Sequence, residues 1–578
     1  MRRLVVAAPP DHPAPRRSWL PAPRRSTEAT PARPLPPARP PCPRVVRCGL
    51  TVTGFGLAAA FYCLSFTPSL LPRPWFLQGV VAGITAVTGY AAGTTIGALV
   101  RLHWWPSDRT VRIAWRILFA LVPLLILLFL WLGTRWQREL RVRLDMGPPQ
   151  EYDLARTVGV SLLTFGVLLL IARILRLATH GLAHVFGHVV PESAAYCAGF
   201  VVVTVISYGA FDGLLIDHLY TTADRSAAIT DSGTGHGIVR PASALCSGGP
   251  GSLVRWESLG RQGRNFVARA PTPAQLTAFS GRTARDPIRL YAGLASAGTV
   301  EERARLVIRE MDRTGAFDRA VVAVFTPTGT GWVDNDVTSS LEYMYAGDTA
   351  LVSMQYSYLP SWISFAVDRA KVTAAAAALI TAVHDRWAAM PPTARPKLLI
   401  FGESLGTYGT EKTFGSVEQM IAGADGILLE GPTFANPIHQ RLTAGRAPGS
   451  TVWDPEFPDL RVAFAAEAPE LRHLAGLPPK VVYMQNSSDP VVWWSPSLLW
   501  HRPLWLKDRR GPDVTHDMHW YPGITFWQTT VDLLFANKTP TGHGHVYKSG
   551  TVDGWAALAP PPGWTVGDTV RLRALLDR

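Results

Sequence analysis

The sequence is poor in charge for a chain of its length. Only 17% of its 578 residues are charged, whereas 47% are hydrophobic, and its mean hydropathy is +0.11. Typical soluble domains carry about 25% charged residues. The deficit excludes a wholly soluble chain and indicates a membrane part joined to a water-soluble part.

Cysteine is also scarce, with five residues at Cys42, Cys48, Cys63, Cys197 and Cys246. No two of them have C-x-x-C spacing, and none stands at metal-ligand spacing from a histidine. The sequence therefore supports neither a zinc site nor a disulfide framework. We expect no metal and no cofactor.

The net charge of +13 is concentrated near the start of the chain, where ten arginines up to Arg47 accompany only Asp11 and Glu28. No aromatic residues are interleaved with these arginines, so the charge does not indicate nucleic-acid binding. Residues 1–44 are rich in Pro, Arg and Ala and lack a hydrophobic period, which predicts a disordered tail beside a membrane. The charged stretch is also too long for the start of a signal peptide.

A multi-span transmembrane domain is expected over residues 45–217. A helix needs roughly 20 apolar residues to cross the hydrocarbon core. Five stretches qualify, at about 48–70, 78–100, 113–134, 157–178 and 194–216. The first two are rich in Gly, Ala and Thr, which favours close contact between helices in a bundle.

Five crossings would place the two ends of the chain on opposite sides of the membrane. The basic tail and the loop with Arg101 and Arg109 should face the cytoplasm by the positive-inside rule, although the loop with Arg135 and Arg138 then opposes it. We expect a multi-pass membrane protein with a cytoplasmic N-terminus and an extracytoplasmic C-terminal domain.

The remainder of the chain predicts a linker at 218–245 and an α/β domain at 246–578. Short buried apolar runs alternate with helical segments there, which is typical of a mostly parallel sheet with helices on both faces. We expect strands at 287–294, 319–325, 350–356, 397–401, 425–431 and 480–485. The segment "ITFWQTTVDLLFA" fits either a strand or a helix.

The stretch "RPKLLIFGESLGTYG" places Ser404 between Gly402 and Gly406, directly after a predicted strand. The G-x-S-x-G pattern alone is weak, and a serine there could simply cap a helix. A strand that leads into the pattern favours a nucleophile on a sharp strand-to-helix turn.

A serine nucleophile needs a base and a carboxylate that orients it. In α/β-hydrolases these follow in the order Ser, Asp or Glu, His. Asp489 follows the strand at 480–485, although an Asp before Pro also commonly makes a turn. The Gly-rich stretch "TGHGHVY" offers His543, which we prefer, and His545 as the alternative base.

Two backbone N–H groups should form an oxyanion hole. Leu405, which follows the serine, would supply one. The loop "TPTGTGW" after the strand at 319–325 would supply the other, from among Thr328, Gly329 and Thr330. An ordinary glycine turn is the alternative reading of this loop.

Several stretches resemble those of bacterial multi-pass membrane α/β-hydrolase proteins, which join an N-terminal membrane domain to a C-terminal hydrolase domain. The similar stretches are "SLVRWESLGRQGRNFV", "TPTGTGW", "GDTALVSMQYSYLPSW", "FGESLG", "SSDPVVWW", "DMHWYPGITFWQ", "GHGHVY" and, in the first half, "SFTPSLLPRPWFLQG". The resemblance implies a serine hydrolase with Ser404 as nucleophile, Asp489 as acid and a histidine of "GHGH" as base.

The sequence thus predicts a membrane-bound serine hydrolase of esterase, lipase or thioesterase type. Its expected substrate is a lipid-like or cell-envelope acyl compound, because segments 433–478 and 491–527 extend the standard fold and the second is rich in tryptophan. Those tryptophans could line a pocket, lie at the bilayer interface or pack the core. Alternatives are an acyltransferase with the same nucleophile and a non-catalytic scaffold or transport-associated protein. The sequence leaves the oligomeric state open.

Overall fold

A computed structural model describes most of the chain after residue 49. The described residues are 50–103, 106–147, 153–210, 217–359, 363–365, 369–457, 461–465, 471, 478–548 and 550–577. The expected disordered tail at 1–44 lies outside them.

Five helices open the described chain: α1 Val52–Leu64, α2 Trp75–Val100, α3 Asp108–Arg143, α4 Leu154–Phe186 and α5 Glu192–Gly209. Among the described residues, four helices, α2 to α5, are long and apolar enough to cross a membrane. The expected first span at 48–70 is not one continuous helix, because α1 ends at Leu64. Pro68, Pro72 and Pro74 follow, and proline interrupts the hydrogen bonds of a helix interior.

Helix α1 nevertheless runs along most of α2. A Cβ atom on Gly97 of α2 would lie 2.2 Å from the hydroxyl of Thr53, and near the other end of α2 the Gln78 side chain donates to the Ser65 carbonyl at 3.3 Å. A Cβ on Gly89 would lie 2.6 Å from the Leu57 carbonyl oxygen. The expected close contact between the first two apolar stretches is therefore confirmed, and glycine makes it possible.

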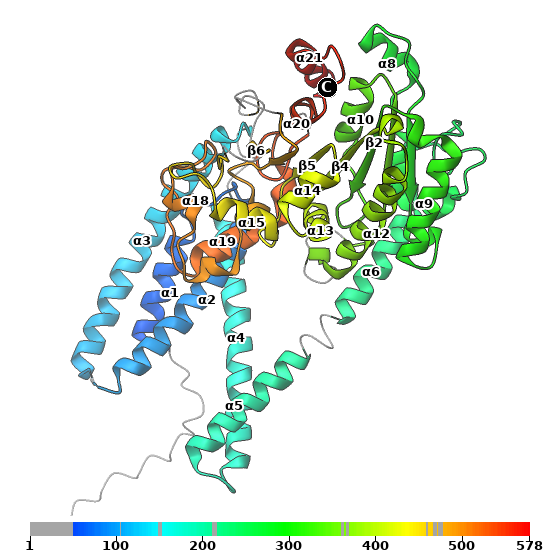
Figure 1. Ribbon diagram of the computed structural model, residues 1–578. Coiled ribbons are helices and arrows are strands. Elements are labelled where there is room, and N and C mark those ends of the chain that lie inside the picture. The colour runs from blue at the N-terminus through cyan, green and yellow to red at the C-terminus, as the bar shows by residue number, and fades with distance from the viewer. Residues whose placement is uncertain are drawn as a thin grey trace, which may run out of the picture. The chain divides into compact units, whose positions relative to one another are not determined.

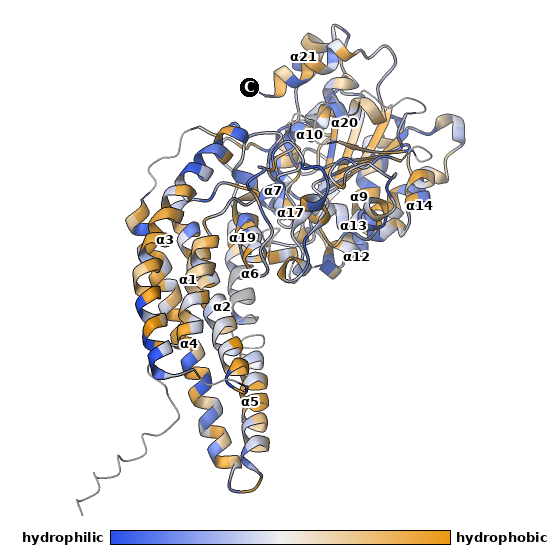
Figure 2. Cartoon of the chain, turned by 90° about the vertical axis from the view of Figure 1, so that its left-hand side faces the viewer, coloured by the Kyte–Doolittle hydropathy of each residue, from blue (hydrophilic) through white to orange (hydrophobic). Residues whose placement is uncertain are grey.

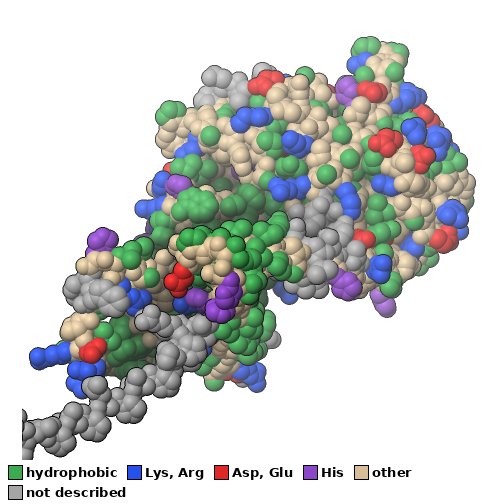
Figure 3. Space-filling view, turned by 90° about the horizontal axis from the view of Figure 1, so that it is seen from below, with side chains coloured by type: hydrophobic (Ala, Val, Ile, Leu, Met, Phe, Trp, Pro, Cys, Tyr) green, Lys and Arg blue, Asp and Glu red, His purple; other side chains and the backbone are tan. Residues whose placement is uncertain are grey.

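Helices α3 and α4 carry large apolar side chains on their outer surface. Phe119 and Leu127 of α3 are 67% and 64% exposed, and Leu163 of α4 is 67% exposed. Figure 2 shows the hydrophobic colour along these helices, and Figure 3 shows apolar side chains gathered over the helical region. Such an outer surface is typical of helices surrounded by lipid.

The segment expected to be a linker is partly helical. Helix α6, Asp217–Ser232, covers the first half of residues 218–245. Its residues are mostly small and polar, which is why the sequence predicted a linker there. The chain is non-helical only between Ser232 and the 3-10 helix η2, Trp256–Leu259.

The second half of the chain contains a sheet of seven described strands, all parallel, in the order β1-β3-β2-β4-β5-β7-β6. The strands are β1 Ile288–Ala292, β2 Val321–Thr326, β3 Thr349–Met354, β4 Lys397–Glu403, β5 Gly426–Glu430, β6 Val462–Ala465 and β7 Val481–Met484. The six predicted strands are present. The short edge strand β6 was not predicted.

Helices cover both faces of this sheet (Figure 1). The α-helices of this half are α7 Gly260–Ala268, α8 Pro273–Ser280, α9 Val300–Thr314, α10 Asn335–Met344, α12 Arg369–Ala388, α13 Leu405–Phe414, α14 Val417–Gly423, α15 Pro437–Ala444, α17 Pro490–Trp493, α18 Leu504–Lys507, α19 Ile524–Asp532, α20 Gly550–Leu558 and α21 Val566–Leu576. The 3-10 helices after η2 are η3 Leu294–Ser296, η4 Ala316–Asp318, η5 Pro392–Ala394, η6 Pro496–Leu499 and η7 Leu533–Lys538.

Two buried apolar clusters explain why the strands read as continuous hydrophobic runs. Side chains of α9, α12 and α13 pack on one set of strand residues, including Val322 and Ile400. Side chains of α7, α10 and α20 pack on the alternate set, including Ala323 and Phe401. Both faces of each strand are therefore buried, as in a doubly covered parallel sheet.

The helical half and the α/β half meet in a buried polar junction. The connector Ser65–Arg73, between α1 and α2, surrounds Asp532 at the end of α19. That carboxylate accepts from the Ser69 hydroxyl at 3.2 Å and from the Leu70 N–H at 3.2 Å. Arg73 lies 3.9 Å from Asp532, and both side chains are fully buried. The connector between α1 and α2 thus holds α19, which leads directly into η7.

Candidate active site

Ser404 lies on a strained turn between β4 and α13. Its backbone has φ 53° and ψ −121°, a positive φ that is uncommon for a residue with a side chain. The Ser404 N–H donates to the Glu430 carbonyl at 2.9 Å, which fixes the turn to the end of β5. Strain held in this way is typical of functional positions, and a sharp turn from a strand into a helix is also the geometry of a nucleophile elbow.

Both glycines of the motif are required by close backbone approach. A Cβ atom on Gly406 would lie 2.2 Å from the Thr326 carbonyl oxygen, and one on Gly402 would lie 3.0 Å from the Gly406 carbonyl carbon. The first turn of α13 therefore rests directly on the end of β2. The structure brings the predicted serine to the carboxyl edge of the sheet, where open α/β sheets bind ligands.

Asp489 and His545 form a buried pair beside this turn. Nδ1 of His545 lies 2.7 Å from Oδ2 of Asp489, and the two side chains are 5% and 0% exposed. The carboxylate also accepts from the Tyr547 hydroxyl at 2.6 Å and from the Val491 N–H at 2.8 Å. These bonds fix the imidazole, whose other nitrogen, Nε2, has no hydrogen-bond partner among the described residues.

His543, the base that the sequence favours, lies in a different environment. Its Nδ1 is 3.1 Å from Asp513, and its Nε2 is 3.5 Å from Asp145, which follows α3. The structure thus pairs Asp489 with His545 and not with His543, and only His545 lines the cavity that contains Ser404. The reason is Gly544, whose φ of +54° turns the chain between the two histidines.

The residues expected at the oxyanion hole are only partly in place. Leu405 begins α13, and the first N–H groups of a helix have no partner within it. In the other loop, the Thr328 N–H donates to the Trp332 carbonyl at 3.0 Å, so this group is occupied within the loop. Thr328 and Thr330 line the cavity, whereas Gly329 is not among its described lining residues.

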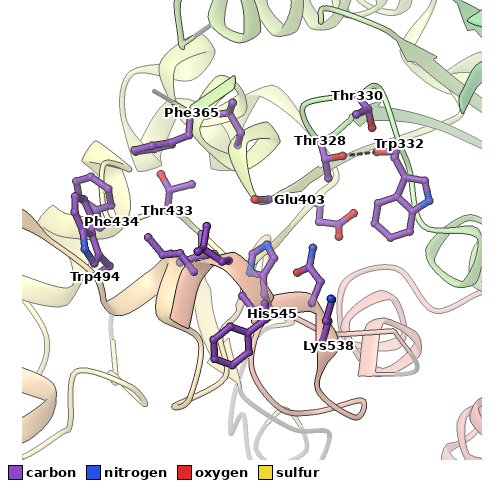
Figure 4. A pocket seen from close by; sticks show the side chains of 18 of the residues that line it. Thr328, Thr330, Trp332, Phe365, Glu403, Thr433, Phe434, Trp494, Lys538 and His545 are labelled. Atoms are coloured by element: carbon purple, nitrogen blue, oxygen red, sulfur yellow. Dashed lines mark hydrogen bonds between the residues drawn. The ribbon is translucent and has the colours of Figure 1, made fainter. Parts of the chain in front are cut away.

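Ser404 and His545 open into one cavity of about 680 Å³. One end is aromatic: the ring centroids of Phe434 and Trp494 lie 4.7 Å apart, and Phe365 lies 5.1 Å from Phe434. Figure 4 shows His545 between these rings and the opposite end, where Trp332, Thr330 and Lys538 lie. The cavity can therefore hold a molecule with one apolar and one polar part.

Two buried carboxyl groups flank the serine. Burial, together with the charges of Asp334 and Glu430, raises the pKa of Glu403 well above its usual range. Burial also raises the pKa of Glu430 to about 8, although the Thr551 hydroxyl donates to it at 2.6 Å. Burial therefore favours the protonated form of both carboxyls, and a protonated carboxyl can donate a hydrogen bond.

Sequence reasoning missed three residues of this site. Tyr547 holds Asp489, and Glu403 lines the cavity. Gly431, at φ +57°, leaves room for the imidazole, because a Cβ there would lie 2.3 Å from Cε1 of His545. The signals were present as a glycine directly after β5 and a tyrosine two residues after His545.

The tryptophans of segment 491–527 lie in different environments. Trp493 and Trp505 are buried at 6% and 5% exposure and pack in a cluster that includes Leu70 and Leu71 of the connector. Trp494 lines the cavity, and Trp500 is 59% exposed. The uncertain segment "ITFWQTTVDLLFA" is helical and forms α19 and part of η7.

Comparison with known proteins places the chain in a family. Residues 288–572 match the model of an alpha/beta-hydrolase family, and residues 66–271 match the model of that family's N-terminus. The chain belongs to this alpha/beta-hydrolase family. Membership indicates a hydrolase-type function. No curated protein and no solved structure matches the chain.

Proposed function

We propose that this alpha/beta-hydrolase is a membrane-bound serine esterase with Ser404, His545 and Asp489 as its catalytic triad. The observation that carries the proposal is the strained turn of Ser404 in a cavity shared with His545, whose Nδ1 lies 2.7 Å from Asp489. The apolar rings of the cavity favour an acyl substrate. The chain order Ser, Asp, His also matches the α/β-hydrolase order.

In the proposed mechanism, the Ser404 Oγ attacks the carbonyl carbon of an ester while Nε2 of His545 accepts the hydroxyl proton. Asp489 holds the imidazole through Nδ1 and stabilises the positive charge that develops on it. The N–H of Leu405 stabilises the oxyanion. His545 returns the proton to the leaving alcohol, and water then releases the acid from the acyl-enzyme. An acyltransferase would differ only in the use of an alcohol in place of that water.

The experiment that tests the proposal is labelling of the full-length protein, in detergent or native membranes, with a fluorophosphonate probe. We expect Ser404 to be labelled, and labelling to disappear in Ser404→Ala. The matched control is Ser416→Ala, because the Ser416 hydroxyl only caps α14. A folded wild-type protein that remains unlabelled would contradict the proposal and favour the non-catalytic scaffold.

The membrane arrangement is part of the proposal. Helices α2 to α5 cross the bilayer, and α1 runs antiparallel along α2, so the start of α1 lies at the end of α2 that carries Gly97. This course supports an extracytoplasmic catalytic domain opposite a cytoplasmic N-terminus. Reporters fused after residue 578 test it: alkaline phosphatase should be active there and green fluorescent protein dark. The reverse pattern would place the domain in the cytoplasm.

A further inference from the structure

The cavity beside Ser404 is polarised, and its polar end has a chemistry of its own. Trp332 is 36% exposed although it lines the cavity, so its indole presents an open face. Thr330 of the same loop, Gln262 of α7 and Lys538 of η7 also line the cavity. Aromatic rings with an apolar face, accompanied by amide, hydroxyl and ammonium groups, bind ligands that are flat on one side and hydroxylated at the edges.

The loop that carries Trp332 is held in place by several hydrogen bonds. The Tyr291 hydroxyl donates to the Gly331 carbonyl at 2.8 Å, and the Gln355 amide donates to the Thr330 carbonyl at 3.0 Å. Gly331 has a φ of +84°, and a Cβ there would lie 2.3 Å from the Tyr291 oxygen. The indole is thus presented on a preorganised support, which lowers the entropy cost of binding.

Glu403 adds a buried donor between the serine and this loop. Its side chain lies on the side of the cavity where Thr328 and Trp332 lie (Figure 4). The residue is 8% exposed, lines the cavity, and has Oε2 buried without a hydrogen-bond partner. Leaving such a buried group unpaired is unfavourable, and a substrate group that pairs with it would recover this cost.

The aromatic end is lined mainly by rings, with Thr433 beside Phe434 and the Arg369 guanidinium 5.2 Å from the centroid of the Phe365 ring. Phe434 and Trp494 pack edge to face, and Trp494 continues to Phe526 of α19 with 5.7 Å between ring centroids. A chain of methylene groups gains free energy on burial against such rings. Gly523, which precedes α19, lies close to Phe61 of α1 and Thr88 of α2. A Cβ atom on Gly523 would lie 3.9 Å from each of these two side chains. The aromatic end therefore adjoins an element that packs on the membrane helices.

We propose that the substrate is a lipid ester of a sugar, with its acyl chain against Phe434 and Trp494 and its sugar ring stacked on Trp332. A sugar hydroxyl accepts a hydrogen bond from the Glu403 carboxyl, and Thr330, Gln262 and Lys538 contact further hydroxyls. This inference rests on the proposed function and names its substrate class. The ester C–O bond breaks, the sugar oxygen leaves with the proton from His545, and water completes the hydrolysis of the acyl-enzyme.

The test compares kcat/KM for two esters of one fatty acid, a glucose 6-O-ester and an ethyl ester, with the full-length protein in detergent. We expect the glucose ester to be favoured at least about tenfold, since hydrogen-bonded hydroxyl groups contribute strongly to discrimination. In Trp332→Ala the ratio of the two values should fall by about tenfold or more. Trp500→Ala, an exposed tryptophan outside the cavity lining, is the matched control and should keep the ratio.

A second pair of variants isolates the role of Glu403. The amide of Glu403→Gln can still donate a hydrogen bond, whereas Glu403→Ala cannot. The glucose-to-ethyl ratio should therefore be higher in Glu403→Gln than in Glu403→Ala. Equal ratios in the two variants would show that Glu403 does not hydrogen-bond to the sugar.

Failure of this inference is distinguishable from failure of the proposed function. If Ser404 is labelled by fluorophosphonate but the wild-type ratio is near one, the esterase stands and the sugar site does not exist. An unchanged ratio in Trp332→Ala would overturn the stacking. A glycerol ester that is as good a substrate as the glucose ester would also overturn it, because glycerol has no ring to stack.

Discussion

The two histidines of the "GHGH" stretch lie two residues apart in very different surroundings. His545 is turned toward the serine and is held by Asp489 and, through it, by Tyr547. His543 is turned toward the other side of the loop, between Asp513 and the Asp145 that follows α3. One side of this loop belongs to the cavity and the other to the contact with the membrane helices.

The comparison shows that a carboxylate beside a histidine does not by itself indicate catalysis. Both histidines have such a partner, and both are largely buried. What distinguishes His545 is that its second nitrogen has no partner and that its ring lines the cavity of Ser404. A general base needs that open nitrogen within reach of the proton it accepts.

The largest expected effect comes from replacing each of the two histidines by alanine in turn. In His545→Ala we expect kcat for a p-nitrophenyl ester to fall by about 10⁴-fold or more, because the variant lacks the proposed acceptor of the serine proton. His543→Ala should lower kcat by much less. The measurement is initial rate at saturating ester, with folding checked by thermal unfolding. Equal losses in the two variants would contradict the assignment of His545 as the base.

The second prediction concerns the membrane side of the same region. The backbone N–H of His545 donates to the Ala536 carbonyl of η7 at 2.9 Å. Helix η7 directly follows Asp532 of the junction. In Arg73→Met the buried carboxylate of Asp532 loses its cation, which should cost about 3–5 kcal/mol in the free energy of unfolding. Thermal unfolding in detergent should show an earlier midpoint.

The matched control for this change is Arg285→Met. Arg285 pairs with Asp348 at 2.7 Å on the surface, where the two side chains are 52% and 33% exposed. Exposed pairs contribute about 0–1 kcal/mol, so the midpoint should barely move. If Arg73→Met were as stable as this control, the junction would not hold the two halves together.

The smallest expected effect is the pH dependence of the His543 contact. The hydrogen bond with Asp513 raises the pKa of His543 above its usual value, with a further contribution from Asp145. A raised pKa contributes stability that is fully present below the unfolded value of about 6.5 and is lost as the pH rises through the folded value. The unfolding midpoints of wild type and His543→Ala should differ by roughly 1–3 °C near pH 5.5.

This difference between the midpoints should shrink as the pH rises through the raised pKa of His543 in the folded protein. A difference that stays constant with pH would show that His543 acts by packing alone. A difference that grows with pH would contradict the direction of the pKa shift.

Sequence reasoning succeeded where the signal is local. The strand at 397–401, the flanking glycines and the serine lie within ten residues, and their order alone predicts the elbow. Asp489 lies in the loop after β7, which ends at Met484, and this position was also expected from the local pattern. Local patterns also predicted α3 and α4, since long apolar runs have few alternatives to a membrane helix.

Sequence reasoning failed where distant contacts decide. The choice between His543 and His545 depends on the turn at Gly544 and on the room left by Gly431, more than 100 residues away. The first span was misplaced because the apolar residues Leu70 and Leu71 extend the hydrophobic run past α1, yet they are buried against the hydrolase half. The edge strand β6 has only four residues, too few for a periodic signal.

The junction at Asp532 also sets an order in time. Ser69 and Asp532 are 463 residues apart in the chain, so at about 5–20 residues per second they leave the ribosome roughly 20 to 90 seconds apart. Throughout that interval the connector lacks the carboxylate that accepts its N–H groups. The late-synthesised residues 524–545 bring α19, η7 and His545 together. A nascent chain therefore gains this anchor and the proposed base almost at the same moment.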